Sequence, residues 1–203
     1  MFSRLTPVTL TLIIANVVVF LFQSSTGDVL FEHFALWPLT SDTSYGAPTF
    51  QPWQLVSYAF LHGGTGHLFF NMLALYMFGS DIERVFGRNR FIAYYLACVI
   101  SAAVAQLLVA IVTGAQPYPT VGASGGIFGI LLAFGMFYPQ RRILLLIPPI
   151  PMPAWLFVTL YGVVELAMGV TGFDSSVAHF AHLGGMAGGY MLIRVWRNSR
   201  RRM

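Results

Sequence analysis

Six long apolar stretches, separated by polar connections, constrain the fold of this chain more than any other feature. Apolar residues make up 57% of the sequence and charged residues only 9%, a composition typical of membrane proteins. A helix needs about 20 apolar residues to cross a bilayer, within a range of roughly 17–25. We therefore predict an all-α polytopic membrane protein with a single domain, residues 1–203. Its six spans are expected at about 5–22, 67–85, 91–113, 124–138, 153–171 and 177–196.

The distribution of arginine gives this bundle an orientation. All 11 basic residues are arginines, whereas the connections 23–66, 114–123 and 172–176 contain neither arginine nor lysine. Because basic residues concentrate in cytoplasmic loops, we expect both termini inside and these three connections outside. The basic tail 197–203 is expected to face anionic lipid headgroups and not a nucleic acid. A bacterial inner membrane is the expected location, since the chain is compact and shows no targeting presequence.

The first outer connection is too long and too apolar to be a plain linker. Residues 31–39 and 53–61 mix aromatic and polar side chains, so both are predicted to lie in the membrane interface. Residues 40–52 are rich in Ser, Thr, Gly and Pro and predict a turn-rich surface stretch. On the inner side, the proline-rich run 148–153 cannot be helical.

A glycine-flanked serine, Ser124, opens the fourth apolar stretch within the sequence Val-Gly-Ala-Ser-Gly-Gly-Ile-Phe-Gly. Free backbone N–H groups at a helix start favour a developing anion next to such a hydroxyl. A stretch of about 15 residues covers only ~22 Å of a hydrocarbon core about 30 Å thick. Ser124 is therefore predicted below the outer surface, at the floor of a wet pocket open to the outside.

A base for this serine is available on the sixth stretch. His182 lies about five residues into that stretch, which is roughly 7 Å deep and level with Ser124. Small-xxx-small glycine patterns on the fourth and sixth stretches predict that the two helices approach closely. That approach would bring the hydroxyl within reach of the imidazole, at about 2.6–3.2 Å. The glycines concerned are Gly125, Gly129, Gly184, Gly185, Gly188 and Gly189.

Two hydrogen-bond donors complete the expected site. His67 and Asn71 are spaced i, i+4 at the outer end of the second stretch and could stabilise an oxyanion. No acidic residue is expected beside His182 at a suitable depth, because Asp174 is too superficial, so the sequence predicts a Ser–His dyad. Taken singly, each motif has a structural reading, namely helix packing for Ser124 and interfacial capping for the His-x-x-x-Asn pair.

Other polar residues are assigned structural roles. Glu165 is expected to face the bundle, neutral or paired, with a role in gating left open. His179 is expected to support the start of the sixth helix, and Cys98 to be buried as an apolar residue. His67 and His182 lack a cysteine or acid at ligand spacing, so neither a metal nor a cofactor is expected.

Together these motifs make the chain resemble the six-helix bacterial type of rhomboid intramembrane serine protease. The resemblance is carried by residues 67–71, 122–125 and 181–185, in that order, and by Glu-Arg-Val-Phe-Gly at 83–87. It implies Ser124 as nucleophile, His182 as base, and an oxyanion hole formed by His67, Asn71 and the Ser124 backbone N–H. It also implies that Gly122 permits the loop conformation and that Gly185 permits close helix packing.

The chain departs from that family's usual pattern at two positions. Phe128 stands where many relatives have tyrosine, so ring stacking on His182 is expected to survive without the hydroxyl. In the first outer connection, Trp53 is followed by Gln54 where many relatives have arginine, which puts the stability of that loop in question.

The sequence therefore predicts an intramembrane serine endopeptidase that acts on peptide bonds near the outer face of the membrane. By resemblance, its substrates are single-span transmembrane proteins with a small residue before the cut, admitted past the fifth span and an outer loop. The alternative is a catalytically inactive relative that binds or escorts membrane helices, although such a protein is expected to lack the serine or histidine. A solute transporter is disfavoured, because the polar cluster lies near one face and no repeat is visible. The oligomeric state cannot be read from the sequence.

Overall fold

The computed structural model describes residues 5–26, 28–39, 48–114, 118–145, 149–173 and 177–200, without the side chain of Arg200. The stretch predicted at 40–52 and the tail predicted at 197–203 lie partly outside these residues. In chain order the elements are α1 (Pro7–Thr26), α2 (Val29–Phe34), α3 (Gln54–Ser57), η2 (Tyr58–Phe60), α4 (Thr65–Ala74), η3 (Leu75–Gly79), α5 (Ser80–Phe86), α6 (Arg88–Thr113), α7 (Ser124–Phe137), β1 (Arg142–Leu144), β2 (Pro151–Pro153), α8 (Ala154–Thr171) and α9 (His179–Arg200).

The predicted helical membrane bundle is confirmed. Each predicted span is helical, and its boundaries shift by at most four residues. The second span is a continuous run in which a π-helical segment, η3, joins α4 to α5. Three helices, α1, α6 and α8, are long and apolar enough to cross a membrane, with 20, 26 and 18 residues. Because α7 has only 14 residues and α9 does not meet the same hydropathy criterion, the count of six spans stays a prediction.

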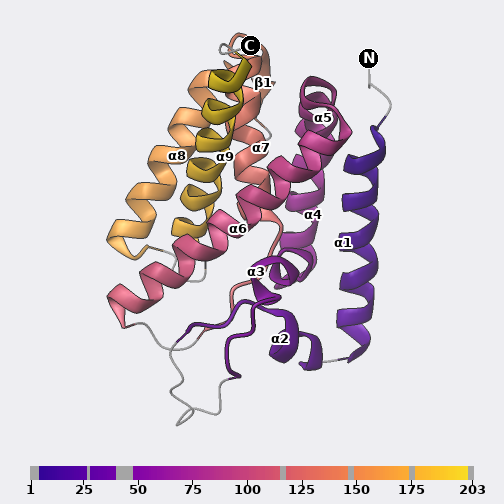
Figure 1. Cartoon of the computed structure of the whole chain (residues 1–203), viewed down its shortest axis with the longest axis vertical. Helices are drawn as coiled ribbons and strands as arrows, with labels where there is room; N and C mark the ends of the chain where they lie inside the picture. The colour runs from indigo at the N-terminus through magenta and orange to yellow at the C-terminus, as the bar shows by residue number, and fades with distance from the viewer. Residues whose placement is uncertain are drawn as a thin grey trace.

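The helices run between two distinct ends of the bundle (Figure 1). α1 begins and α9 ends at the end that carries α5 and β1, here called the arginine end. α2 and α3 lie at the opposite end, here called the loop end. α6 crosses the bundle obliquely, and α9 packs against α6, α7 and α8. The core between these helices includes Tyr94, Tyr95 and Cys98, each at most 2% exposed, and Cys98 is buried as predicted.

The connection between α7 and α8 contains a short hairpin. β1 pairs antiparallel with β2, with Ile143 opposite Met152. Residues 151–153 of the proline-rich run form β2 and are not helical, as predicted, because proline fixes φ and lacks an N–H donor. The strand pairing was not predicted. Prolines lack an N–H donor, but their carbonyl groups can accept hydrogen bonds, so this run can still lie beside a neighbouring strand.

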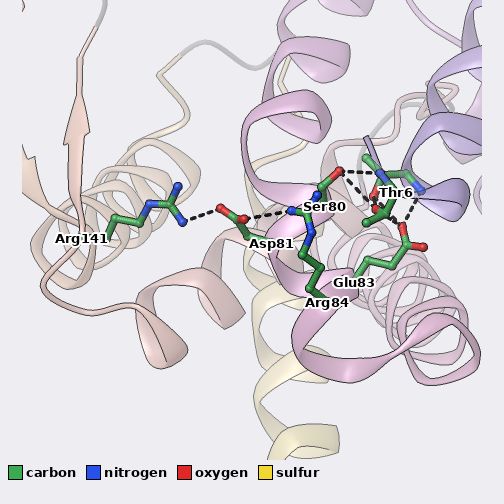
Figure 2. A network of polar contacts seen from close by, with 7 residues as sticks. Thr6, Ser80, Asp81, Glu83, Arg84 and Arg141 are labelled. Carbon is green, nitrogen blue, oxygen red and sulfur yellow. Dashed lines mark hydrogen bonds and ion pairs between the residues drawn. The ribbon is translucent and has the colours of Figure 1, made fainter. Parts of the chain in front are cut away.

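Polar contacts tie the helices together at the arginine end (Figure 2). The buried carboxylate of Glu83 on α5 accepts hydrogen bonds from the backbone N–H groups of Val8 and Thr9, at 3.1 and 2.8 Å. It also accepts from the Thr6 hydroxyl, so it caps the positive N-terminus of α1. Also on α5, the Asp81 carboxylate pairs with Arg141, at 2.6 Å between Nη1 and Oδ2.

The first outer connection is held by a side chain that the resemblance had put in question. Gln54 is fully buried, and its Oε1 accepts hydrogen bonds from the backbone N–H groups of Trp37 and Gln51, both at 3.2 Å. Its Nε2 donates to the backbone carbonyl of His33 at 3.3 Å. The neutral amide of Gln54 therefore links the backbone at His33, Trp37 and Gln51, where many relatives have a cationic arginine side chain at this position.

Candidate active site

Ser124 is the first residue of α7, and the chain leading to it is pinned by the first outer connection. Thr120 exchanges two backbone hydrogen bonds with Leu36, each 3.0 Å long. The Gly122 N–H then donates to the Tyr58 carbonyl at 3.0 Å, while the Tyr58 hydroxyl donates to the Val99 carbonyl of α6 at 2.8 Å. The backbone on the N-terminal side of the serine is therefore fixed to two other parts of the fold.

Gly122 must be glycine for both conformational and steric reasons. Its φ is +125°, a region that side chains rarely adopt. A Cβ at this position would lie 2.8 Å from Nε2 of His67. The loop before Ser124 thus passes directly over the His67 ring, and only a bare backbone fits.

The predicted close approach of α7 and α9 is present. A Cβ on Gly185 would overlap the backbone carbonyl of Gly125, so the two helices touch through their main chains. The other predicted glycine contacts are only partly correct. Gly184 and Gly188 face Ala105 and Ser101 of α6 and not α7. The spacing of the glycines does not predict which neighbouring helix each one faces, because α9 packs against α6, α7 and α8.

This approach brings the serine and the histidine together. Oγ of half-buried Ser124 lies 2.8 Å from Nε2 of His182, within hydrogen-bond distance. The His182 ring stacks on Phe128 from the next turn of α7, with ring centroids 4.2 Å apart and planes 8° apart. The stacking expected of Phe128 is therefore present, and it leaves the imidazole little freedom to rotate.

A carboxylate lies behind the histidine, contrary to the sequence prediction. Oε2 of Glu165, on α8, lies 2.9 Å from Nδ1 of His182. The prediction failed because only acids close to His182 in sequence were considered. α8 and α9 lie side by side, so Glu165, near the end of α8, is level with His182, near the start of α9. The same depth estimate that matched Ser124 to His182 would have found Glu165, which does face the bundle and is paired, as expected.

His179 joins the same carboxylate oxygen. Its Nδ1 lies 2.7 Å from Oε2 of Glu165, and all three side chains are buried. Two histidines and a carboxylate are ligand types that a metal ion accepts, and their ligand atoms lie within 4.8 Å of one another. The separations of 2.7 and 2.9 Å are hydrogen-bond distances, so we describe the group as a hydrogen-bonded cluster.

The two predicted oxyanion donors, His67 and Asn71, come from α4. Nδ1 of His67 accepts a hydrogen bond from the Gly63 N–H at 3.3 Å, so its Nε2 carries the proton beside Gly122. Asn71 is 6% exposed and donates one amide hydrogen to the His67 carbonyl at 2.9 Å. An amide has a second N–H, and both residues line the same cavity as Ser124.

The site faces a cavity of about 570 Å³. Its wall combines the loop before Ser124 with residues of α4, α6, α7, α8 and α9, and α8 contributes Tyr161. The starts of α4, α7 and α9 contribute polar groups to this wall, and apolar side chains such as Phe70 and Leu131 also line it. A cavity of this kind can hold an extended peptide segment beside the serine.

His62, in the loop before α4, supports this wall from behind. The side chain is fully buried, and its ring centroid lies 5.1 Å from that of His67. Burial, together with the neighbouring His67, lowers the pKa of His62 to about 4. Gln23 of α1 holds the loop by bonding both the N–H and the carbonyl of His62, at 3.1 and 2.6 Å. His62 is thus a neutral packing residue, and no sequence motif singled it out.

Comparison with known proteins assigns the chain to a family. The sequence profile of the rhomboid domain matches residues 49–199, which include His67, Asn71, Ser124, Glu165 and His182. The chain belongs to the rhomboid family. Since α1, α6 and α8 are also apolar enough to cross a bilayer, this rhomboid is an integral membrane protein.

Similar proteins include rhomboids of two bacteria. The Rhomboid protease GluP of Bacillus subtilis is 32% identical over 138 residues, which are 68% of this chain and 25% of GluP. The B. subtilis protein YdcA is 29% identical over 192 residues, 94% of this chain and 89% of YdcA. The Rhomboid protease GlpG of Yersinia pestis is 25% identical over 205 residues, 98% of this chain and 66% of GlpG. This chain thus spans only a quarter of the length of GluP.

Proposed function

We propose that this rhomboid is an intramembrane serine endopeptidase in which Ser124 is the nucleophile and His182 the general base. The observation that carries the proposal is the 2.8 Å contact between Ser124 Oγ and His182 Nε2 at the wall of a cavity. Both atoms come from helices held at a fixed separation by backbone contact, which is the geometry that a proton transfer requires.

Acylation begins when Ser124 Oγ attacks the peptide carbonyl and His182 Nε2 takes the hydroxyl proton. The carbonyl carbon becomes tetrahedral and its oxygen becomes an anion. His182 then donates the same proton to the leaving amine, the C–N bond breaks, and an acyl-Ser124 ester remains. Water then attacks the ester carbonyl as His182 takes its proton, the C–Oγ bond breaks, and His182 returns the proton to Ser124 Oγ. The acid product leaves and loses its own proton to solvent.

The oxyanion is stabilised by donors that converge on the start of α7. We assign His67 Nε2–H, the Asn71 amide and the Ser124 backbone N–H to this role. The unpaired N–H groups and partial positive charge of a helix N-terminus favour the same anion. Donors of this type act strongly where water is scarce, because the surroundings do not screen them.

Substrates are proposed to be single-span transmembrane proteins cut near the outer face of a bacterial inner membrane, with both termini of the enzyme in the cytoplasm. The absence of basic residues from the connections 23–66, 114–123 and 172–176 supports this orientation. So does the arrangement in which α1 begins and α9 ends at the arginine end (Figure 1). α8, which contributes Tyr161 to the cavity wall, is the proposed entry side for a substrate helix.

A fluorophosphonate probe tests the central claim, since it phosphonylates activated serines. The purified full chain in detergent is labelled and the modified residue is mapped by mass spectrometry. We expect a mass shift on Ser124 that is lost in Ser124→Ala and in His182→Ala. Ser101→Ala is the matched control, because the Ser101 hydroxyl lies nearby on α6 and only donates to the Gly184 carbonyl at 2.8 Å.

Each outcome decides between the proposal and its alternative. Labelling of Ser124 in the wild type and in Ser101→Ala supports an active hydrolase. If the wild type is not labelled under conditions that label a related rhomboid, the proposal is overturned, and a helix-binding protein without activity becomes the better account.

A further inference from the structure

The carboxylate on α8 extends the serine–histidine pair into a line of three groups. From Ser124 Oγ to His182 Nε2 the distance is 2.8 Å, and from His182 Nδ1 to Glu165 Oε2 it is 2.9 Å. An ionised carboxylate can only accept hydrogen bonds, so Nδ1 of His182 carries the proton. Nε2 is then left unprotonated and facing the serine, which is the tautomer that a general base needs.

A second histidine, His179, holds the Glu165 carboxylate in position. Nδ1 of His179 reaches the same oxygen at 2.7 Å, so Glu165 Oε2 is fixed from two sides by residues one turn apart on α9. Glu165 is 4% exposed, His179 6% and His182 8%. A buried carboxylate is unfavourable unless it is hydrogen-bonded, and these two N–H donors satisfy that condition.

We propose that Glu165 and His179 are positioning residues for catalysis, with Glu165 holding His182 in its reactive tautomer and stabilising the imidazolium formed when Ser124 attacks. This inference rests on the proposed hydrolase function and goes beyond the predicted dyad. During the reaction Glu165 keeps its charge and accepts the Nδ1 hydrogen bond, while every transferred proton passes through His182 Nε2 and none reaches Glu165.

The charged and titratable groups around His182 come from four helices. α7 presents Ser124 and Phe128, neither of which titrates in the relevant range. α4 presents His67, and α9 presents His179. α8 presents Tyr161, through its contact with Phe128, and Glu165. Within the described residues, Glu165 is therefore the anion in direct contact with the imidazole.

The test compares Glu165→Gln with the wild type, using the rate of fluorophosphonate labelling between pH 5 and pH 9. We expect the labelling rate at neutral pH to fall about 10²-fold. We also expect the acid limb of the rate profile to move, because the imidazolium formed during the reaction has lost its anionic partner. A purely structural glutamate would change the stability without moving this limb.

Two further variants separate charge from packing. Glu165→Asp keeps the charge, so its acid limb is expected near that of the wild type even where the shorter side chain lowers the rate. Glu83→Gln is the matched control, since Glu83 is also a buried carboxylate but bonds only to the start of α1 among the described contacts. It is expected to lower stability and leave the pH profile unchanged.

Nitrogen-15 NMR of the histidine-labelled protein gives a readout that does not depend on activity. In the wild type, His182 is expected to be protonated at Nδ1 and unprotonated at Nε2, and Glu165→Gln is expected to populate the other tautomer. If the wild type is labelled but Glu165→Gln matches it in rate, acid limb and tautomer, the positioning role is overturned while the hydrolase stands. If the wild type is not labelled at all, it is the proposed function that fails.

Discussion

Two buried glutamates join helices in this protein, and the difference between them lies in their donors. Glu83, at the arginine end, accepts from backbone N–H groups and hydroxyls at the start of α1 (Figure 2). Glu165, beside the cavity, accepts from two imidazoles. Amide and hydroxyl donors hold their protons across the physiological range, whereas imidazoles gain and lose them. Glu83 is therefore a structural clamp, whereas Glu165 is proposed to take part in the chemistry.

The largest change is expected in the activity of a variant that alters the cavity wall. Asn71→Ala removes a proposed oxyanion donor and should lower the turnover of a cleaved transmembrane peptide by about 10²–10³-fold. The affinity for the peptide should change little, because the donor acts on the transition state. Gln106→Ala, which alters another polar side chain of the same cavity wall, is the control. Equal losses in both variants would argue against an oxyanion role.

At the arginine end, the corresponding change should affect folding alone. Glu83→Gln places an NH₂ group among N–H donors and removes the charge that caps α1, so we expect a loss of about 2–4 kcal/mol in stability. Thermal unfolding in detergent measures this loss. Labelling per folded molecule should be unchanged, and a selective loss of labelling would contradict the division between clamp and chemistry.

His62 tests whether proton-sensitive groups gather on the cavity side. Its pKa of about 4 lies below the usual value of about 6.5, so the folded loop disfavours the charged form. The stability that follows is present at pH 7 and is lost as the pH falls through 6.5 towards 4. The expected loss is about 2 kcal/mol between pH 7 and pH 5. Unfolding of His62→Phe should be less sensitive to acid, whereas His33→Gln, at an exposed histidine of the same connection, should follow the wild type.

The smallest effect is expected from the surface pair at the arginine end. Asp81→Asn breaks the contact with Arg141, whose side chain is 54% exposed, so the loss in stability should be below about 1 kcal/mol. Thermal unfolding beside Glu83→Gln gives the comparison directly. A loss as large as that of Glu83→Gln would show that exposure is a poor guide at this end.

Much of the fold could be predicted, because membrane spans are encoded by long apolar stretches that need no tertiary context. The pairing of Ser124 with His182 also followed, since depth along a helix is simple to estimate from residue number. Glycine patterns gave the close approach of α7 and α9 but not the partners of Gly184 and Gly188. That assignment depends on how α9 is rotated, which the sequence pattern does not contain.

The third member of the site was missed for a physical reason as well. An acidic residue in an apolar stretch is read first as an unfavourable group, so the sequence predicts that Glu165 is neutral or paired but names no partner for it. Its role depends on two partners on another helix, one turn apart, that share a single oxygen. The signal was present in His179 and His182, which have the i, i+3 spacing of a common helix face. The sequence shows no comparable signal for the π-helical segment η3.

The contact between Gly125 and Gly185 affects which amino-acid substitutions this protein can tolerate. Because the backbones themselves touch, the separation of Ser124 and His182 is set by main-chain atoms, which every sequence shares. Substitutions elsewhere in the apolar core alter side-chain volumes without altering that separation. The reactive geometry therefore depends less on side-chain packing than on Gly185, where a single added methyl group would overlap the Gly125 carbonyl.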